Sequence, residues 1–296
     1  MQLVTTVEDF RKAKSSLRGT WGFVPTMGYL HEGHLSLVRR AKAENDRVVV
    51  SIFVNPTQFG PSEDLAAYPR DLERDLKLIE PIGVDLVFHP APDVMYPLGF
   101  QTYVGIEEVT RTLEGAARPG HFRGVATIVT KLFNIVQADR AYFGQKDAQQ
   151  VVVIRRMVAD LDIPIRIVVC PTVREPDGLA MSSRNAYLDP AQRSAATVLF
   201  RALSAAKARC DAGERDAEAI RGAMRAALGQ EPLAKVEYVS AADPLTLREL
   251  DRVEDDVLLS MAVRIGKTRL IDNFLKENRA WLTGEIVAQS HGRVVR

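Results

Sequence analysis

Short apolar runs alternate with helical runs through the first 175 residues, and this alternation constrains the fold more than any other feature of the sequence. The run VVVSIFV, residues 48–54, is almost continuously apolar, as expected of a strand that is buried on both faces. Alternation of this kind predicts a parallel sheet with right-handed crossovers, in which ligands bind beyond the carboxyl ends of the strands. The expected strands are Trp21–Pro25, Arg47–Val54, Asp85–His89, Ala141–Gly144 and Ile165–Cys170, and the helices between them include Leu35–Glu44, Asp71–Glu80, Ala126–Gln137 and Gln149–Asp160.

The pattern changes after about residue 175. A long helix rich in Ala, Leu and Arg is expected over Pro190–Cys210, and a shorter one over Ala217–Leu228. The segments KVEYVSAAD and VLLSMAVRIGKTRLIDNF then read as strands around turns. We therefore expect an α/β protein with a doubly wound parallel sheet over residues 1–175, a smaller α+β domain over 176–283, and a flexible polar tail over 284–296.

The bulk composition excludes several classes of protein. The chain has 296 residues, of which 46% are hydrophobic and 26% charged, and its formal net charge is +1. With so little net charge, no global field recruits nucleic acid or an anionic membrane. No run approaches the roughly 20 apolar residues of a bilayer-spanning helix, and the N-terminus lacks the apolar stretch of a signal peptide. Cys170 and Cys210 form neither a disulfide framework nor a zinc pattern, so we expect a cytoplasmic protein with reduced thiols.

Two histidines three residues apart follow the first buried strand. In FVPTMGYLHEGHLSLVRRA, Thr26–Gly28 form a tight turn, and a helix is expected to begin near Gly33. A helix N-terminus offers free N–H groups to a phosphate, and His31 and His34 could donate further hydrogen bonds to a triphosphate. Two other interpretations stay open. One is a metal pair, although HEGH lacks the HExxH spacing and a third ligand, and the other is a pair of histidines that cap or pack the helix.

Polar residues also follow the second buried strand and precede a later apolar helix. In VNPTQFGPSEDLAAYPRD, Asn55, Gln58 and Tyr68 are neutral hydrogen-bonding residues that suit a hydroxy acid. The alternative is ordinary turn chemistry, because Asn-Pro and Gly-Pro are common in loops. The basic segment RPGHFRGV places Arg118, His121 and Arg123 in a Gly-rich loop before the helix, where they could hold a carboxylate or cover a site. A solvated basic loop explains that segment equally well.

Two further segments have the composition of phosphate-binding loops. In AYFGQKDAQQ a strand ends at Gly144, Asp147 is expected to N-cap the next helix, and Lys146 lies where a lysine can neutralise phosphate. In PTVREPDGLAMSSRN, two serines and an arginine lie in a Gly-containing loop, which can wrap phosphates. Each pattern is weak alone, because such residues are common in solvated loops.

The order of these segments is far more specific than any one of them. His31–His34 and Met181–Arg184 resemble the HIGH and KMSKS elements of class I nucleotidyltransferases, which hold ATP phosphates during adenylyl transfer. The segments PTMGYLHEGH, FVNPTQFG, YPRD, RPGHFRGV, FGQKDAQQ and AMSSRN, in this order, resemble the pantothenate synthetase family. The resemblance covers about residues 20 to 190 and extends more loosely to about residue 280. Position 145 is Gln where some family members carry Glu.

The resemblance implies a Rossmann-like fold, a two-step reaction and a set of site residues. In the first step the carboxylate of pantoate attacks the α-phosphate of ATP, giving pantoyl adenylate and pyrophosphate; in the second, the amine of β-alanine attacks the adenylate, giving pantothenate and AMP. The residues expected to contact ATP are Met27, Gly28, Tyr29, Leu30, His31, Glu32, Gly33, His34, Gly144, Gln145, Lys146, Asp147, Val173, Met181, Ser182, Ser183 and Arg184.

Within that set, the resemblance gives catalytic roles to His31, His34 and Lys146, with His34 as the proton donor to the departing phosphate. It implies that Gln58 and Gln150 bind pantoate, and that Gln58 also lies near β-alanine. Asn55, Tyr68 and His121 are second choices for the substrates, and Asp75 is a tentative ligand of the Mg²⁺ that accompanies ATP. The family also implies a homodimer.

Three other functions compete with this one. A related small-molecule nucleotidyltransferase shares HxGH and the serine loop but does not predict FVNPTQFG or FGQKDAQQ. A fragment that binds or charges tRNA requires a basic surface, which a net charge of +1 does not favour. A nucleotide-binding relative without catalysis is disfavoured because the histidines, Lys146 and the serine loop are all present.

Overall fold

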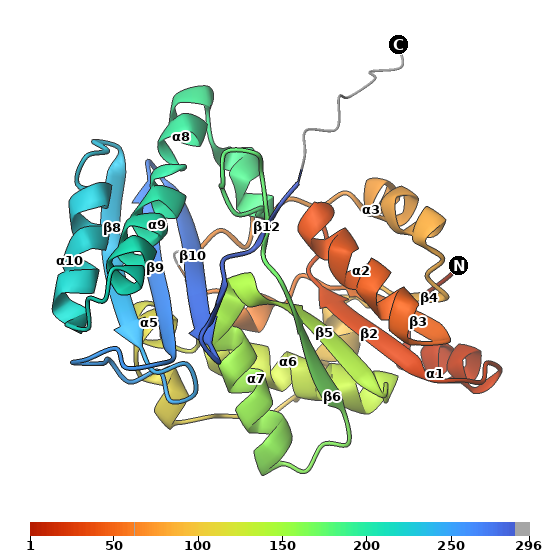
Figure 1. The fold of residues 1–296 in the computed structure, drawn as a ribbon. Coiled ribbons are helices and arrows are strands. Elements are labelled where there is room, and N and C mark those ends of the chain that lie inside the picture. Colours follow the sequence, from red (N-terminus) through yellow and green to blue (C-terminus); the bar gives the residue numbers. More distant parts are fainter. Residues whose placement is uncertain (62, 288–296) are drawn as a thin grey trace. The chain divides into compact units, whose positions relative to one another are not determined.

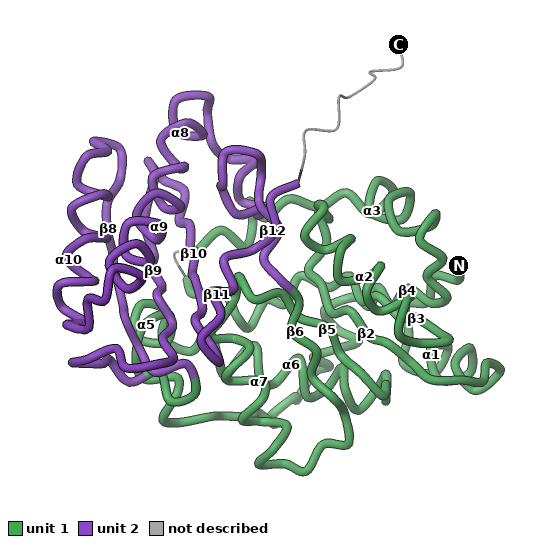
Figure 2. The backbone as a smooth tube through the Cα atoms, viewed as in Figure 1, with its two compact units in different colours: residues 1–170, 245–247 green, residues 171–244, 248–296 purple. Residues whose placement is uncertain are grey.

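The computed structural model describes residues 1–61 and 63–287. The chain divides into two compact units (Figure 2). Unit 1 consists of residues 1–170 and 245–247, and unit 2 consists of the rest of the described chain. The division therefore falls after Cys170, whereas the sequence placed the boundary near residue 175.

Unit 1 contains a six-stranded sheet in the order β1-β4-β3-β2-β5-β6, in which every pair of neighbours is parallel (Figure 1). This confirms the doubly wound α/β fold. The expected strands all form, with ends that differ by a few residues. The strands are β1 (Gln2–Val4), β2 (Trp21–Thr26), β3 (Arg47–Ile52), β4 (Leu86–Phe88), β5 (Arg140–Gly144) and β6 (Arg166–Cys170).

Helices cover both faces of this sheet because alternate strand residues point to opposite sides. On one face Val24 belongs to the same buried cluster as Val38 of the following helix. On the other face the Phe23 ring lies edge-on to the Phe133 ring, with centroids 6.4 Å apart. The longer helices of unit 1 are α1 (Val7–Ser15), α2 (Glu32–Glu44), α3 (Leu72–Ile79), α6 (His121–Val136) and α7 (Ala148–Asp160), and the shorter ones are α4 (Pro92–Met95) and α5 (Leu113–Ala117).

The order of strands creates a switch point between β2 and β5. From β2 the chain proceeds through β3 to β4 in one direction, whereas β5 and β6 extend the sheet in the other. In open α/β sheets a crevice forms beyond the carboxyl ends of the strands at such a point. The segment after β2 carries HEGH and the segment after β5 carries QKD, so the topology brings together two of the motifs that the sequence singled out.

Unit 2 contains a four-stranded antiparallel sheet in the order β11-β10-β9-β8. Its helices pack with the strands around a core that includes Leu203, Ile220 and Phe274. The strands are β8 (Ala234–Ala242), β9 (Val257–Ile265), β10 (Thr268–Glu277) and β11 (Ala280–Leu282), and the helices are α8 (Pro190–Ala195), α9 (Val198–Asp211) and α10 (Ala217–Leu228).

The single helix expected over Pro190–Cys210 is wrong, because the structure divides it into α8 and α9 around residues 196–197. The Thr197 hydroxyl donates a hydrogen bond of 2.8 Å to the Ser194 carbonyl oxygen. Such side-chain bonds compete with the regular hydrogen bonds of a helix. The composition of residues 190–210, rich in Ala, Leu and Arg, gave no sign of this break.

A two-stranded parallel ladder joins the start of unit 2 to its described end. β7 (Val173–Arg174) pairs with β12 (Glu285–Ile286). The first residues of the expected flexible tail therefore belong to a strand, and the remainder of that tail, residues 288–296, lies outside the described residues.

Candidate active site

A buried carboxylate holds the turn after β2. Gly28 has φ 82° and Tyr29 has φ 51°, so two successive residues adopt the left-handed conformation. A Cβ atom on Gly28 would lie 3.0 Å from Cγ2 of Ile52 and 3.1 Å from Oδ2 of Asp75, which is why glycine is needed there. The backbone N–H groups of Tyr29 and Leu30 donate hydrogen bonds of 2.7 Å each to the two oxygens of Asp75.

These contacts change the interpretation of Asp75. The residue is 1% exposed, and burial raises the pKa of its carboxyl group although the two backbone N–H groups act in the opposite direction. Both oxygens are engaged by the chain's own backbone. No group of three or more His, Cys, Asp or Glu side chains that could hold a metal occurs within residues 1–61 and 63–287. Its contacts thus make Asp75 a clamp on the turn, and its role as a Mg²⁺ ligand stays a prediction.

The two histidines after this turn cap α2. His31 is the N-cap residue, and its Nδ1 accepts a hydrogen bond of 3.1 Å from the Gly33 N–H. The His31 N–H in turn donates a bond of 3.3 Å to Nδ1 of His34. The capping interpretation that the sequence left open is thus correct for both Nδ1 atoms. Within the described chain, neither Nε2 atom has a hydrogen-bond partner.

The cap also decides which protonation state each ring adopts. An Nδ1 atom that accepts a hydrogen bond carries no proton, so in the neutral ring the proton is on Nε2. Burial and the neighbouring cations lower the pKa of His31, and burial followed by the Lys146 ammonium lowers the pKa of His34 to about 4. Near pH 7 both rings are therefore neutral, and each presents one Nε2–H donor.

The segment after β5 contributes the nearby cation. β5 ends at Gly144, Gln145–Asp147 form a single 3-10 turn, and α7 begins at Ala148. The ammonium of Lys146 lies 4.0 Å from an Asp147 carboxylate oxygen, and its charge acts on both histidines. Asp147 stands at the N-cap position, as the sequence predicted, but its side chain makes no capping hydrogen bond.

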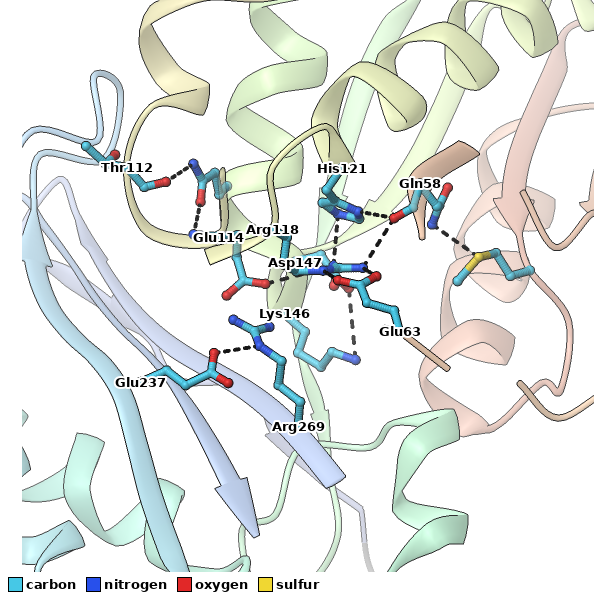
Figure 3. Close-up of polar contacts among 12 residues, drawn as sticks. Gln58, Glu63, Thr112, Glu114, Arg118, His121, Lys146, Asp147, Glu237 and Arg269 are labelled. Carbon is cyan, nitrogen blue, oxygen red and sulfur yellow. Dashed lines mark hydrogen bonds and ion pairs between the residues drawn. The ribbon is translucent and has the colours of Figure 1, made fainter. Parts of the chain in front are cut away.

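A network of amide groups follows β3. The Asn55 side chain is 1% exposed, and its Nδ2 donates bonds of 2.9 Å to Oε1 of Gln58 and 3.2 Å to the Gly124 carbonyl oxygen. The Gln58 Nε2 donates to the Met27 sulfur, 3.2 Å away. Figure 3 draws this contact as a dashed line from Gln58 to a sulfur atom. Gly124 is required at this place, because a Cβ there would lie 2.3 Å from the Thr57 carbonyl oxygen.

The basic segment before α6 is tied to the same loop. Arg118 donates two hydrogen bonds of 2.7 Å each to the carboxylate of Glu63, which together with other contacts lowers the pKa of Glu63 to about 2 although burial opposes this (Figure 3). The His121 Nδ1 lies 2.8 Å from the Gln58 carbonyl oxygen, and its Nε2 lies 3.1 Å from Arg118. Both ring nitrogens of His121 are therefore occupied, and burial, chiefly, lowers its pKa to about 4.

The adjacent glutamines of α7 have opposite surroundings. Gln149 is buried, accepts a hydrogen bond from the Glu114 N–H and donates to the carbonyl oxygens of Val109 and Thr112. Gln150 is half-buried, and its side chain has no hydrogen-bond partner within the described chain. The structure thus leaves free the glutamine that the sequence selected for substrate binding.

The remaining predicted residues divide between buried supports and half-buried side chains. Tyr68 is buried, with its ring 5.9 Å from that of Phe59. The side chain of Leu30 is fully buried, so only its backbone can meet a ligand, and Glu32 is paired with Arg39.

The serine loop belongs to unit 2. Val173 and Ser183 are buried, Met181 and Arg184 are half-buried, and the Ser182 hydroxyl accepts a bond of 3.3 Å from the Arg184 N–H. The loop is anchored by Arg174, a residue that sequence reasoning missed.

Arg174 is fully buried and pairs with the two oxygens of Asp272 at 2.7 and 2.8 Å. It also donates to the Gly178 carbonyl oxygen at 3.0 Å, and the rings of Phe200 and Phe274 each lie 5.1 Å from its guanidinium carbon. The ion pair and the hydrogen bonds offset the cost of removing the arginine charge from water, so its burial is tolerated. Its sequence context, VREPDG, gives no sign of burial.

Comparison with known proteins identifies the family. The model of the pantoate–β-alanine ligase family matches residues 2–275. A pantothenate synthetase of Roseiflexus castenholzii is 64% identical over 277 residues, which are 94% of this chain and 100% of that protein. The pantothenate synthetase of Chloroflexus aurantiacus is 63% identical over 278 residues, 94% of this chain and 99% of that protein.

Solved structures agree with the sequence relatives. The crystal structure of a pantothenate synthetase from Thermus thermophilus superimposes with a TM-score of 0.89 at 50% identity, covering 92% of this chain and 98% of that one. The ligase from Francisella tularensis, solved with β,γ-ATP and β-alanine, gives 0.77 at 37% identity, covering 94% and 98%. Within the described chain no helix is both long and apolar enough to cross a bilayer. On the family model, the relatives and the shared fold, this chain belongs to the pantoate–β-alanine ligase family.

Proposed function

We propose that this chain joins pantoate to β-alanine at the expense of ATP, through a pantoyl adenylate that releases pyrophosphate. The observation that carries the proposal is the pair of Nε2–H donors of His31 and His34, oriented by the cap of α2 and left without partners within the described chain. They lie after β2 at the switch point of the sheet, where α/β proteins bind nucleotides.

In the first step the residues around this cap stabilise negative charge. The carboxylate of pantoate attacks the α-phosphorus, and the bond to pyrophosphate breaks. The two imidazole N–H groups and the Lys146 ammonium are suited to the charge that develops on the departing phosphates. With a pKa of about 4 in the nucleotide-free protein, His34 presents a neutral hydrogen-bond donor near pH 7. The negative charge of bound ATP raises the pKa of an adjacent imidazole, so the proton-donor role that the resemblance implied stays a prediction.

Pantoate is assigned to the neutral amides beside this donor pair. Gln150 supplies an amide without a protein partner, and Gln58 supplies an N–H whose present acceptor is the Met27 sulfur. Thioether sulfur is a weak acceptor, so a hydroxyl or carboxylate oxygen of pantoate can replace it. We assign a supporting role rather than direct substrate contact to Asn55, Tyr68 and His121. All three are buried, and their polar groups or rings contact other parts of the protein.

Several parts of the proposal rest on the family resemblance alone. These are contacts from Val173 and Met181–Arg184 to ATP, assembly as a homodimer and a cytoplasmic location. Mg²⁺ is expected as the companion of ATP, held by phosphate oxygens and water, since the described side chains offer it no cage.

An isotope experiment tests the adenylate directly. Pantoate labelled with ¹⁸O in its carboxylate is incubated with ATP, β-alanine and the protein, and the AMP is analysed by mass spectrometry. Because the attacking carboxylate oxygen stays on phosphorus when the amine displaces AMP, each AMP should gain one ¹⁸O. Omitting β-alanine is the matched control, in which AMP should not accumulate over many turnovers. Unlabelled AMP, or ADP as the product, would contradict the proposed route.

A further inference from the structure

A tyrosine hydroxyl reaches the amide network behind Gln58. Tyr96 follows α4, and its hydroxyl donates a hydrogen bond of 2.7 Å to Oδ1 of the buried Asn55. Its ring packs against Phe53 and Phe100, with centroids 6.4 and 5.1 Å away. These aromatic contacts restrain the ring, so the direction of the hydroxyl is set by packing as well as by the hydrogen bond.

The hydrogen bonds of Asn55 orient its side chain completely. Its Oδ1 accepts from the Tyr96 hydroxyl at 2.7 Å and from the Thr57 hydroxyl and N–H at 3.0 and 3.4 Å. Its Nδ2 donates to the Gly124 carbonyl oxygen and to Oε1 of Gln58. The bond from Tyr96 is the shortest of the five. The partners in the other four bonds belong to α6 or to the loop after β3, whereas Tyr96 lies outside both.

The orientation of Asn55 dictates which group Gln58 presents. Because Asn55 Nδ2 donates to Oε1 of Gln58, that oxygen is turned toward the protein and the Nε2 group is turned away from Asn55. Among the residues that the structure describes, the Nε2 group meets only the Met27 sulfur, at 3.2 Å. Gln58 therefore offers a donor, which suits an oxygen that carries negative charge or a lone pair, and offers no acceptor.

We propose that Tyr96 is a positioning residue that acts through Asn55 to fix Gln58 as a hydrogen-bond donor to pantoate. The inference rests on the proposed function, which assigns Gln58 to that substrate. Without the Tyr96 hydroxyl, the Asn55 amide loses its shortest bond and Gln58 samples orientations that do not present Nε2. The effect should spare ATP, because neither Tyr96 nor Asn55 contacts the histidine cap or Lys146.

The variant Tyr96→Phe removes the hydroxyl, which also lies 3.1 Å from the Thr57 hydroxyl, and keeps the ring. The Thr57 hydroxyl retains its own bond to Oδ1 of Asn55. We expect the Kd for pantoate, measured by calorimetry, and its KM to rise about 3- to 10-fold, the effect typical of one lost hydrogen bond. The KM for ATP and the melting temperature should stay close to those of the unaltered protein. Tyr103→Phe is the matched control, because the Tyr103 ring lies in the same aromatic row and its hydroxyl has no partner within the described chain.

A double variant separates positioning from a general structural role. If Tyr96 acts through Gln58, then Tyr96→Phe should have no further effect on pantoate affinity in a Gln58→Ala background. Additive effects of the two changes, an unchanged pantoate KM in Tyr96→Phe, or an equal loss for ATP would each overturn the inference. Failure of the proposed function gives a different result, since the unaltered protein would then form no pantothenate from pantoate, β-alanine and ATP.

Discussion

Two histidine-bearing segments of unit 1 look alike in sequence and differ in structure. His31 and His34 in LHEGH use only Nδ1 for the protein, whereas His121 in RPGHF uses both ring nitrogens, one with the Gln58 carbonyl group and one with Arg118. All three rings have a lowered pKa, caused chiefly by burial. The comparison teaches that burial and a lowered pKa are common to all three histidines, whereas the number of ring nitrogens with a protein partner differs between the pair that we propose to bind ATP and His121.

The largest expected effect is on the rate of adenylate formation, in variants that separate the roles of the two ring nitrogens of His34. The variant His34→Asn retains an acceptor near the position of Nδ1 and loses the Nε2–H donor, whereas His34→Gln places an amide near Nε2 and loses the cap. Loss of one donor to a developing charge costs about 2.7–4 kcal/mol, or a 10²- to 10³-fold slower reaction. We expect His34→Asn, like His34→Ala and Lys146→Ala, to show this loss in the rate of adenylate formation.

The second half-reaction is the control for these variants. With pantoyl adenylate supplied, pyrophosphate no longer has to leave, so release of pantothenate should be much less affected. His34→Gln should retain more adenylate formation than His34→Asn but have a lower melting temperature, because a lost cap costs about 0.5–2 kcal/mol. If both half-reactions slow equally in His34→Asn, the ring serves the fold rather than the phosphates.

The corresponding change in the other segment should act on stability. His121→Ala removes the two hydrogen bonds of the ring, to the Gln58 carbonyl oxygen and to Arg118, although both groups keep other partners. At about 0.5–1.5 kcal/mol for each bond, the loss is about 1–3 kcal/mol of unfolding free energy. Urea unfolding should show the loss, while adenylate formation at saturating substrates should fall far less than in His34→Asn. A rate loss of 100-fold with unchanged stability would place His121 with the ligand-binding histidines.

The adjacent glutamines of α7 provide the same contrast on a smaller scale. Gln150→Ala should raise the KM for pantoate about tenfold, the equivalent of about 1.4 kcal/mol, without a change in stability. Gln149→Ala removes three hydrogen bonds to the segment around Thr112 and should lower the melting temperature instead. Measuring KM for pantoate and for ATP in both variants checks the contrast, and it fails if Gln150→Ala weakens the two substrates equally.

A further prediction concerns the pH dependence of stability. His34 and His121 have a pKa of about 4 in the folded protein, against about 6.5 when unfolded, so between these values the unfolded chain binds more protons. Stability should therefore fall as the pH drops from about 6.5 to about 4, by up to about 1.4 kcal/mol per pH unit for each histidine. Urea unfolding across this range should show a shallower slope in His121→Ala, and an unchanged slope would contradict the assignment.

Sequence patterns predicted the fold of unit 1 and the order of the motifs. Buried strands such as Arg47–Ile52 are continuous apolar runs, and the motif residues follow the strand ends, so the switch point could be foreseen once the strands were placed. What could not be foreseen depends on the direction of single side chains. Gln149 and Gln150 are chemically identical and point to different sides of α7. As a result the Gln149 side chain hydrogen-bonds to the protein, whereas the Gln150 side chain has no hydrogen-bond partner within the described chain.

The same limit explains the contacts that were not foreseen. The partners of Asp75, the N–H groups of Tyr29 and Leu30, lie 45 or more positions away in the chain, so its place as a clamp on the turn could not be predicted. Arg174 lies in a polar segment and gave no sign of a buried pair with Asp272, 98 positions away. Long-range hydrogen bonds of this kind leave no periodic pattern in the sequence from which they could be predicted.

The central claim is that a mixed anhydride forms before β-alanine is used, at the donor pair of His31 and His34. The exchange of labelled pyrophosphate into ATP measures this step alone. With pantoate present and β-alanine absent, the unaltered protein should incorporate the label, and His34→Asn should do so 10²- to 10³-fold more slowly. Exchange that requires β-alanine, or that proceeds without pantoate, would contradict the account.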